Sequence, residues 1–237
     1  MMKTNEVALR LQKQQQRLEH AAVSAGRAPA EITLVAVSKK QSVEAILEAY
    51  EAGQRDFGEN YVQELRDKAE QLAHCADLRW HLIGHLQTNK ARVVADLIHC
   101  LHTVCSDKLV RELGSRVRQR RVAAGNVRPL SVLVEVNVSG EASKSGCRPD
   151  ELPGLLQAVE AEEGLTLRGL MTMPPYDPDP ERTRPFFEQL RELRELHGGA
   201  SRLPDMSMGM SHDMHVAIAA GATLVRVGSA IFGERST

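Results

Sequence analysis

The sequence predicts a single α/β domain across residues 1–237, built as a (β/α)8 TIM barrel with an extra helix at its N-terminus. Short apolar segments rich in β-branched residues alternate with longer amphipathic segments, which is typical of a parallel sheet. Eight such pairs follow one another, and this number favours a closed barrel over an open sheet. Segments such as LVAVS and VLVEVN are apolar on both faces, as strands buried on both sides should be.

The elements can be assigned in chain order. Leu11 and Leu18 belong to an apolar pattern near helical spacing, which predicts a helix over 4–25 that ends at Gly26. Strands are then expected at 32–38, 56–59, 80–84, 97–104, 130–137, 165–173, 205–210 and 223–228. Helices are expected between them at 42–53, 61–75, 88–95, 106–124, 149–162, 179–196 and 211–220. The proline-rich segment MPPYDPDP is a loop within this alternation and not a linker.

Composition excludes several classes of protein. The chain is 42% hydrophobic and 26% charged with a formal net charge of −1, so overall charge does not indicate nucleic-acid or membrane-surface binding. Aromatic residues are only 3%, which argues against a base-stacking surface. Four cysteines without a C-x-x-C pair are typical of reduced thiols. With neither a signal peptide nor a membrane-length apolar run, we expect a cytoplasmic protein without membrane contact.

A lysine follows the first predicted strand at the end where barrel active sites lie. Lys39 comes directly after an apolar strand, and a desolvated lysine amine there can condense with an aldehyde. The alternative is a structural lysine that reaches from the strand end into water beside Lys40. Position alone leaves both interpretations open.

Small residues lie at the ends of the last two predicted strands. Gly228 and Ser229 offer backbone N–H groups and a hydroxyl, and the segment Ser207–Ser211 supplies further small donors opposite. Phosphate sites in these barrels frequently use the loops after strands seven and eight. Ordinary turns use the same residues, so spacing alone does not decide between a phosphate site and a turn.

Other clusters favour structural roles. The methionines 206, 208, 210 and 214 are typical of core filling. The pairs His81-x-x-x-His85 and His212-x-x-His215 lack a third ligand, so no metal site is predicted. Arginines between 111 and 121 surround a helix with a buried leucine and valine stripe, which favours a solvated face over an RNA-contacting one.

Several segments together resemble the pyridoxal phosphate homeostasis protein family. They are LVAVSK (34–39), FGENYVQE (57–64), WHLIGHLQTNK (80–90), NVSGEASKSG (137–146), RGLMTM (168–173), MSMGMSHDM (206–214) and VRVGSAIFGER (225–235). Each is weak alone, but their number and order make the resemblance specific. It implies a barrel similar to the N-terminal domain of bacterial alanine racemase.

The resemblance also implies a cofactor and its contacts. Pyridoxal 5′-phosphate (PLP) is expected as a Schiff base on Lys39 and not on Lys40. The phosphate is expected at the segments 207–211 and 226–229, Arg226 at the pyridine nitrogen, and Asn60 near the ring. The implied cofactor-binding residues are Lys39, Asn60, Met171, Ser207, Met208, Ser211, Arg226, Gly228 and Ser229.

An arginine at the pyridine nitrogen disfavours carbanion chemistry. It has no lone pair with which to accept the ring proton, and a protonated ring is the electron sink in PLP enzymes. The chain also ends at Thr237, so a second domain carrying a base is expected to be missing. These points, with the resemblance, favour a protein that binds PLP, buffers it or delivers it to apo PLP-dependent enzymes, and so maintains vitamin B6 and amino-acid homeostasis. The alternatives are a PLP-dependent amino-acid racemase of low activity and an RNA-contacting protein.

Overall fold

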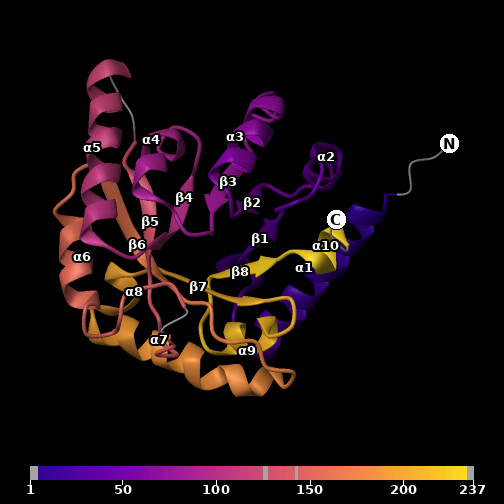
Figure 1. Cartoon of the computed structure of the whole chain (residues 1–237). Helices are drawn as coiled ribbons and strands as arrows, with labels where there is room; N and C mark the ends of the chain where they lie inside the picture. Colours follow the sequence, from indigo (N-terminus) through magenta and orange to yellow (C-terminus); the bar gives the residue numbers. More distant parts are fainter. Residues whose placement is uncertain (1–4, 125–127, 142–143, 234–237) are drawn as a thin grey trace.

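Eight parallel strands close on themselves in sequence order, so each strand pairs with the next and β8 pairs with β1 (Figure 1). The computed structural model describes residues 5–124, 128–141 and 144–233. The strands are β1 (Thr33–Val37), β2 (Asp56–Glu59), β3 (Arg79–Leu82), β4 (Cys100–Val104), β5 (Leu130–Glu135), β6 (Leu165–Met171), β7 (Asp205–Met210) and β8 (Leu224–Val227). The predicted (β/α)8 barrel is confirmed.

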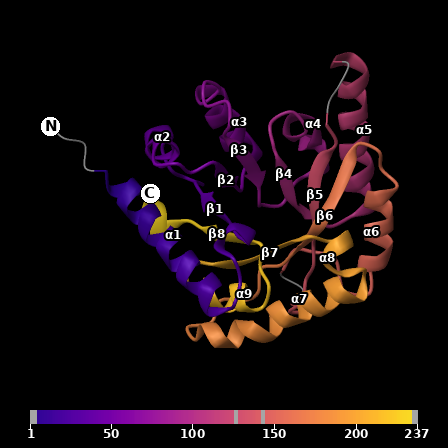
Figure 2. The same cartoon turned by 180° about the vertical axis from the view of Figure 1, so that it is seen from behind.

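Helices connect successive strands and surround the barrel on its outside (Figures 1 and 2). The α-helices are α1 (Glu6–Ser24), α2 (Val43–Glu51), α3 (Val62–Gln71), α4 (Ala91–Val94), α5 (Asp107–Ala124), α6 (Leu152–Glu160), α7 (Arg184–Leu196), α8 (Gly199–Arg202), α9 (Met214–Ala219) and α10 (Ser229–Phe232). Short 3₁₀ turns lie at Pro29–Glu31, Thr88–Lys90 and Pro180–Thr183. The extra N-terminal helix, α1, packs against α9 and α10.

Strand alternation divides the buried side chains into two sets. On β1, Leu34 and Ala36 belong to the large apolar layer between the barrel and its helices, whereas Val35 belongs to a second, smaller cluster. That second cluster lies inside the barrel and contains Val35, Cys100, Leu133, Met171 and Leu224. Because it is small, much of the barrel interior is left to polar side chains, and these build the site described below.

Two short helices were not predicted from the sequence. Helix α8 and helix α10 have only four residues each, too few for a periodic pattern to be visible. The expected helix 88–95 is a 3₁₀ turn followed by one short helix, and the fourth strand begins at Cys100 instead of residue 97. Among the described residues, no helix combines the length and the apolar character that crossing a bilayer needs.

Candidate functional site

A cavity of about 390 Å³ opens at the carboxyl ends of the barrel strands, where active sites of this fold lie. This volume is within the usual range of roughly 300–1,000 Å³ for small-molecule sites. Seven of the nine residues expected to bind a cofactor line it. They are Lys39, Asn60, Met171, Ser211, Arg226, Gly228 and Ser229.

Lys39 lies at the wall of this cavity and is half-buried, whereas Lys40 is exposed and does not line it. The backbone of Lys40 has a positive φ of 59°, so the chain turns sharply directly after Lys39. The backbone N–H of Lys40 donates a hydrogen bond to the Glu64 carboxylate on α3, which fixes this turn. The two adjacent lysines are therefore not equivalent, and of the two only Lys39 lines the cavity.

A buried ion pair supports the segment that carries Lys39. The Lys68 ammonium donates to Glu59 Oε1 at 2.8 Å and to the backbone carbonyl of Ser38 at 2.7 Å. The Ser38 hydroxyl donates to the same Glu59 oxygen at 2.7 Å. Burial raises the pKa of Glu59, and the Lys68 charge opposes that rise. Because the residue before Lys39 is bonded through both its side chain and its carbonyl, the position of Lys39 is tightly constrained.

Arg226 places a buried cation beside the cavity. Its side chain is 5% exposed, with Nη1 donating to Ser207 Oγ at 2.6 Å and Nη2 donating to the Thr172 carbonyl at 3.0 Å. Burial lowers the pKa of Arg226 to about 10, and the carboxylates of Asp213 and Glu135 oppose this effect. The guanidinium therefore remains charged at neutral pH.

Glu135, at the end of β5, faces the same cavity. It is 5% exposed, and its Oε2 atom has no hydrogen-bond partner in the described part of the chain. Burial raises the pKa of Glu135 to about 7, and the Arg226 charge limits the rise. An unpartnered buried carboxyl oxygen is costly, so this atom is suited to a ligand that carries an N–H or O–H group.

Asn60 approaches the cavity because the neighbouring strand end is a glycine. A Cβ added to Gly84 would lie 2.3 Å from the Asn60 carbonyl oxygen. The hydroxyl of Thr103 also donates to the Gly84 carbonyl, at 2.8 Å. The backbone beside Asn60 is thus close-packed, which sets the position of this side chain at the rim.

Comparisons with known proteins show similarity to one family over most of the chain. Residues 11–236 match the family described as alanine racemase, N-terminal domain. A pyridoxal phosphate homeostasis protein of Vibrio cholerae is 48% identical over 223 residues, covering 92% of this chain and 92% of that protein. The protein of the same name in Escherichia coli is 44% identical over 237 residues, covering 98% and 97%.

The chain belongs to the pyridoxal phosphate homeostasis protein family. A solved structure of PipY from Synechococcus elongatus with PLP bound is 37% identical, with a TM-score of 0.74, and covers 91% of this chain and 99% of that one. Alanine racemase from Corynebacterium glutamicum has a TM-score of 0.65 at 17% identity, covering 94% of this chain and 61% of that chain. This second likeness shows the shared barrel fold only.

Two residues that the family resemblance places at the cofactor, Ser207 and Met208, do not line this cavity. Ser207 does not line the cavity: it is fully buried inside the barrel, where its hydroxyl accepts the Arg226 bond. Met208 points to the opposite face of β7 and packs in the apolar layer beneath the helices. Adjacent residues of a strand point to opposite faces, so the side chains of Ser207 and Met208 lie on opposite faces of β7. Whether they contact the cofactor stays a prediction.

The family motifs did not reveal all of the cavity wall. His85, Thr103, Glu135, Tyr176 and His212 also line it. Glu135 could have been found, because a lone carboxylate ends the apolar segment LSVLVE just as Lys39 follows LVAVS. Tyr176 is 72% exposed and lies in the proline-rich loop after β6, where no pattern predicted its direction.

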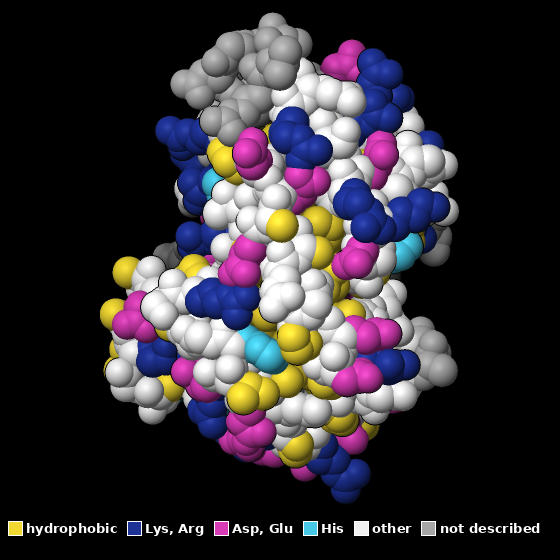
Figure 3. Space-filling view, turned by 90° about the vertical axis from the view of Figure 1, so that its left-hand side faces the viewer, with side chains coloured by type: hydrophobic (Ala, Val, Ile, Leu, Met, Phe, Trp, Pro, Cys, Tyr) yellow, Lys and Arg dark blue, Asp and Glu magenta, His cyan; other side chains and the backbone are white. Residues whose placement is uncertain are grey.

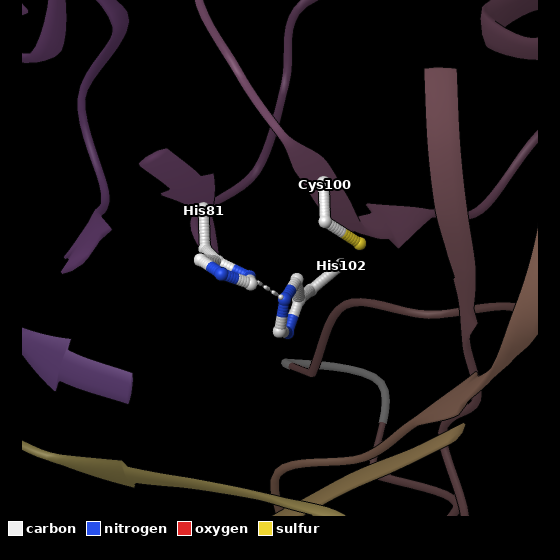
Figure 4. Close-up of side chains that lie close together, drawn as sticks. All are labelled: His81, Cys100 and His102. Carbon is white, nitrogen blue, oxygen red and sulfur yellow. Dashed lines mark hydrogen bonds between the residues drawn. The ribbon is translucent and has the colours of Figure 1, made fainter. Parts of the chain in front are cut away.

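A second set of side chains meets inside the barrel. His81, Cys100 and His102 lie with their ligand atoms within 4.8 Å of one another, and all three are buried (Figure 4). The sequence paired His81 with His85, but its partner in the structure is His102, with His81 Nδ1 and His102 Nε2 2.9 Å apart. Burial raises the pKa of the Cys100 thiol, so without a metal ion this thiol is protonated. The dominant feature is therefore a hydrogen-bonded histidine pair.

Arginines of the basic cluster on α5 form ion pairs with acidic neighbours. Arg116 pairs with Glu112 at 2.8 Å, and Arg118 forms an ion pair with Glu162. Figure 3 shows basic and acidic side chains interspersed over the visible face instead of a continuous basic surface. Nucleic-acid phosphates would compete with these carboxylates, so the arrangement gives no support to an RNA-contacting function. The Arg121 side chain lies outside the described residues.

Proposed function

We propose that this chain binds PLP in the cavity at the carboxyl ends of the strands, and that it buffers the cofactor or delivers it instead of turning over amino acids rapidly. The observation that carries the proposal is the placement of Lys39 in one cavity with Arg226, Ser211 and Gly228. The PLP-bound structure of PipY, a relative that matches most of this chain, supports the same ligand.

The residues present fit PLP in both size and chemistry. Lys39 would hold the aldehyde covalently through its ε-amine. Ser211 and the turn at Gly228 and Ser229 would hold the phosphate through a hydroxyl and backbone N–H groups. Asn60 and Met171 would contact the ring, and Arg226 would face the ring nitrogen. When bound, PLP supplies an aldehyde that reacts reversibly with amines and a ring that withdraws electrons most strongly when its nitrogen is protonated.

Arg226 is the residue that favours storage over catalysis. Its guanidinium is charged at neutral pH, since burial lowers its pKa only to about 10. A charged guanidinium has donors but no acceptor, so it cannot keep a proton on the ring nitrogen. Without that proton the removal of an α-hydrogen from a bound amino acid is disfavoured. Exchange of Lys39 for another amine needs no such step.

Amino-acid racemisation at a low rate is the second candidate, and Glu135 is the observation that favours it. Its pKa of about 7 and its place in the cavity are suited to accepting or donating a proton at neutral pH. A base opposite Lys39 is what such a reaction would need. The two candidates therefore differ in one point. Either Arg226 prevents removal of the α-hydrogen by leaving the ring nitrogen without a proton, or Glu135 removes that hydrogen in spite of Arg226.

One experiment separates the two candidates. The PLP-loaded protein is incubated with L-alanine in heavy water, and the α-hydrogen is followed by proton NMR while the visible absorbance is recorded. We expect a slow absorbance change as the amine exchanges, without loss of the α-hydrogen. Loss at a rate in the usual enzymatic range of roughly 1–10³ per second would favour the racemase. If Glu135→Gln abolished that loss, the base would also be identified.

Delivery is tested with a partner. We expect an apo PLP-dependent enzyme to regain activity when it is mixed with the PLP-loaded protein. The reference is a Lys39→Ala sample, which supplies PLP only in its free form. Reactivation should be faster with the loaded protein than with this reference. Equal reactivation rates from both samples would reduce the function to passive buffering.

The four cysteines form no disulfide among the described residues, which fits the proposed cytoplasmic location.

A further inference from the structure

A continuous line of hydrogen bonds crosses the barrel interior from one mouth to the other. At the amino-terminal mouth, Arg79 forms two bonds to the Asp56 carboxylate, of 2.7 and 2.6 Å. Asp56 Oδ1 lies 2.9 Å from His81 Nε2, and His81 Nδ1 lies 2.9 Å from His102 Nε2. On the far side His102 Nδ1 lies 2.9 Å from the hydroxyl of Ser207, which accepts the bond from Arg226.

These side chains are shielded from water. Asp56, His81, His102, Ser207 and Arg226 are between 0 and 7% exposed. They come from β2, β3, β4, β7 and β8, so the line joins opposite sides of the barrel as well as its two ends. Figure 4 shows its centre, where the His81 and His102 rings meet. Buried polar groups that are fully paired specify a single arrangement.

The chemistry at each end sets the direction of every bond. Arg226 has only donors, so the Ser207 oxygen accepts from it and the Ser207 hydrogen is available for His102 Nδ1. His102 must then carry its proton on Nε2 and donate to His81 Nδ1. His81 in turn carries its proton on Nε2 and donates to Asp56. Although burial alone would raise the pKa of Asp56, its bonds from Arg79 and His81 lower it, so this carboxylate is the acceptor at which the line ends.

Donation of these hydrogen bonds in the opposite direction would be less favourable at both ends of the line. It would put protons on both nitrogens of His81 and would turn the Nδ1–H of His102 toward Ser207. The Ser207 oxygen would then accept twice, and its hydrogen would lack a partner inside a fully buried site. Burial also holds the pKa of His102 well below its ordinary value, which keeps that ring neutral.

We propose that His81, His102 and Ser207 are positioning residues for Arg226: they form a one-directional hydrogen-bonded chain, anchored on Asp56 at the opposite mouth, that fixes the guanidinium toward the cavity. Ser207 holds Nη1, and the Thr172 carbonyl holds Nη2, so the plane of the group is set from two directions. The effect on a bound cofactor rests on the proposed function, whereas the existence of the hydrogen-bonded chain does not.

The first test reads the protons directly in the protein without cofactor. In ¹⁵N-histidine-labelled protein, long-range ¹H–¹⁵N correlation spectra distinguish the two neutral forms of each ring. We expect both His81 and His102 to be protonated on Nε2 only, with signals assigned by the variants His81→Asn and His102→Asn. A proton on Nδ1 of His102, or a doubly protonated His81, would overturn the proposal.

The same spectra decide whether a metal uses these rings instead. A transition metal bound by His81 Nδ1, His102 Nε2 and the Cys100 thiolate would replace the proton between the rings. We expect one equivalent of Zn²⁺ to leave both ring signals unchanged. Loss of the His102 Nε2–H signal on adding zinc would show that the cluster is a metal site and not a positioning chain.

The second test asks whether the hydrogen-bonded chain sets the orientation of Arg226. Ser207→Ala removes one of the two bonds that the structure gives the guanidinium. We expect PLP to bind Ser207→Ala more weakly than the parent protein and with a shifted absorbance band. Ser131→Ala is the matched control, since this serine also lies on a barrel strand but outside the chain; it should leave both properties unchanged.

Asp56→Asn probes the chain from its distant end. Asp56 lines the amino-terminal mouth and not the PLP cavity. We expect the Asp56→Asn substitution to shift the ring nitrogen signals of both His81 and His102. It should also shift the absorbance band of bound PLP. An unchanged band in both Ser207→Ala and Asp56→Asn would refute the positioning role. If no form of the protein bound PLP, the proposed function would fail. The nitrogen spectra of the cofactor-free protein would still decide whether the hydrogen-bonded chain exists.

Discussion

Replacing Glu135 with glutamine should change how stability depends on pH. In the folded protein, burial raises the pKa of Glu135 from 4.5 to about 7. The folded state therefore holds this proton more tightly than the unfolded state does. A folded pKa above the unfolded one gives stability that is fully present below pH 4.5 and is lost as the pH rises through 7.

The size of the effect follows from the two pKa values. A shift of about 2.5 corresponds to about 3 kcal/mol over the full titration. Between pH 5 and pH 8 the Glu135 contribution to the free energy of unfolding falls by about 2.5 kcal/mol. Glutamine has the shape of the protonated carboxyl and does not titrate. Glu135→Gln should thus lose less stability than the parent protein between these pH values, by about that amount.

The assay is urea unfolding of the cofactor-free protein and of Glu135→Gln at pH 5 and pH 8. The change in unfolding free energy between the two pH values is compared, so other titrating groups cancel. Glu70→Gln, at an exposed position on α3, is the control for the loss of one negative charge. If Glu135→Gln and the parent protein lost equal stability between pH 5 and pH 8, the carboxyl would not titrate as its burial indicates.

Three further predictions concern the cavity. Borohydride reduction of the PLP-loaded protein should fix the cofactor on Lys39, as read by peptide mass; a label on Lys40 would contradict the site. Ser211→Ala should weaken binding of PLP by roughly tenfold or more, through loss of a bond worth about 1.5–3 kcal/mol, without changing the affinity for pyridoxal; equal losses for both ligands would place the phosphate elsewhere. Gly84→Ala should destabilise the protein by about 1–3 kcal/mol in urea unfolding, because the new Cβ would meet the Asn60 carbonyl at 2.3 Å; an unchanged midpoint would show that the rim adapts.

The strand pattern could be predicted because it is local. Each strand of this barrel is a short apolar segment, and the alternation with helices leaves few topologies. Lys39 stood out for the same reason, as a charge directly after apolar residues. Helix α10 was missed because four residues give no period.

The interior of the barrel could not be predicted, because it depends on register. His81 and His102 meet because β3 lies beside β4 with His81 opposite Cys100, and no spacing in the sequence encodes that pairing. The pairing of β7 with β8 shifts between Ser207 and Met210. Such a shift changes which side chains reach the cavity; Ser211 lines it, whereas Ser207 does not.

The polar interior is better explained by orientation than by stability. Barrels of this kind are ordinarily filled by layers of branched apolar side chains, whereas here a line from Asp56 to Arg226 occupies the centre. Removing one member of a buried charged network leaves its partners uncompensated, although replacing the whole set with apolar residues is often neutral or stabilising. Each member of the line thus depends on the others, and what they jointly determine is the direction of one guanidinium. Under the proposed function, a fixed Arg226 keeps its N–H donors toward the ring nitrogen, and a guanidinium has no acceptor with which to hold a proton there.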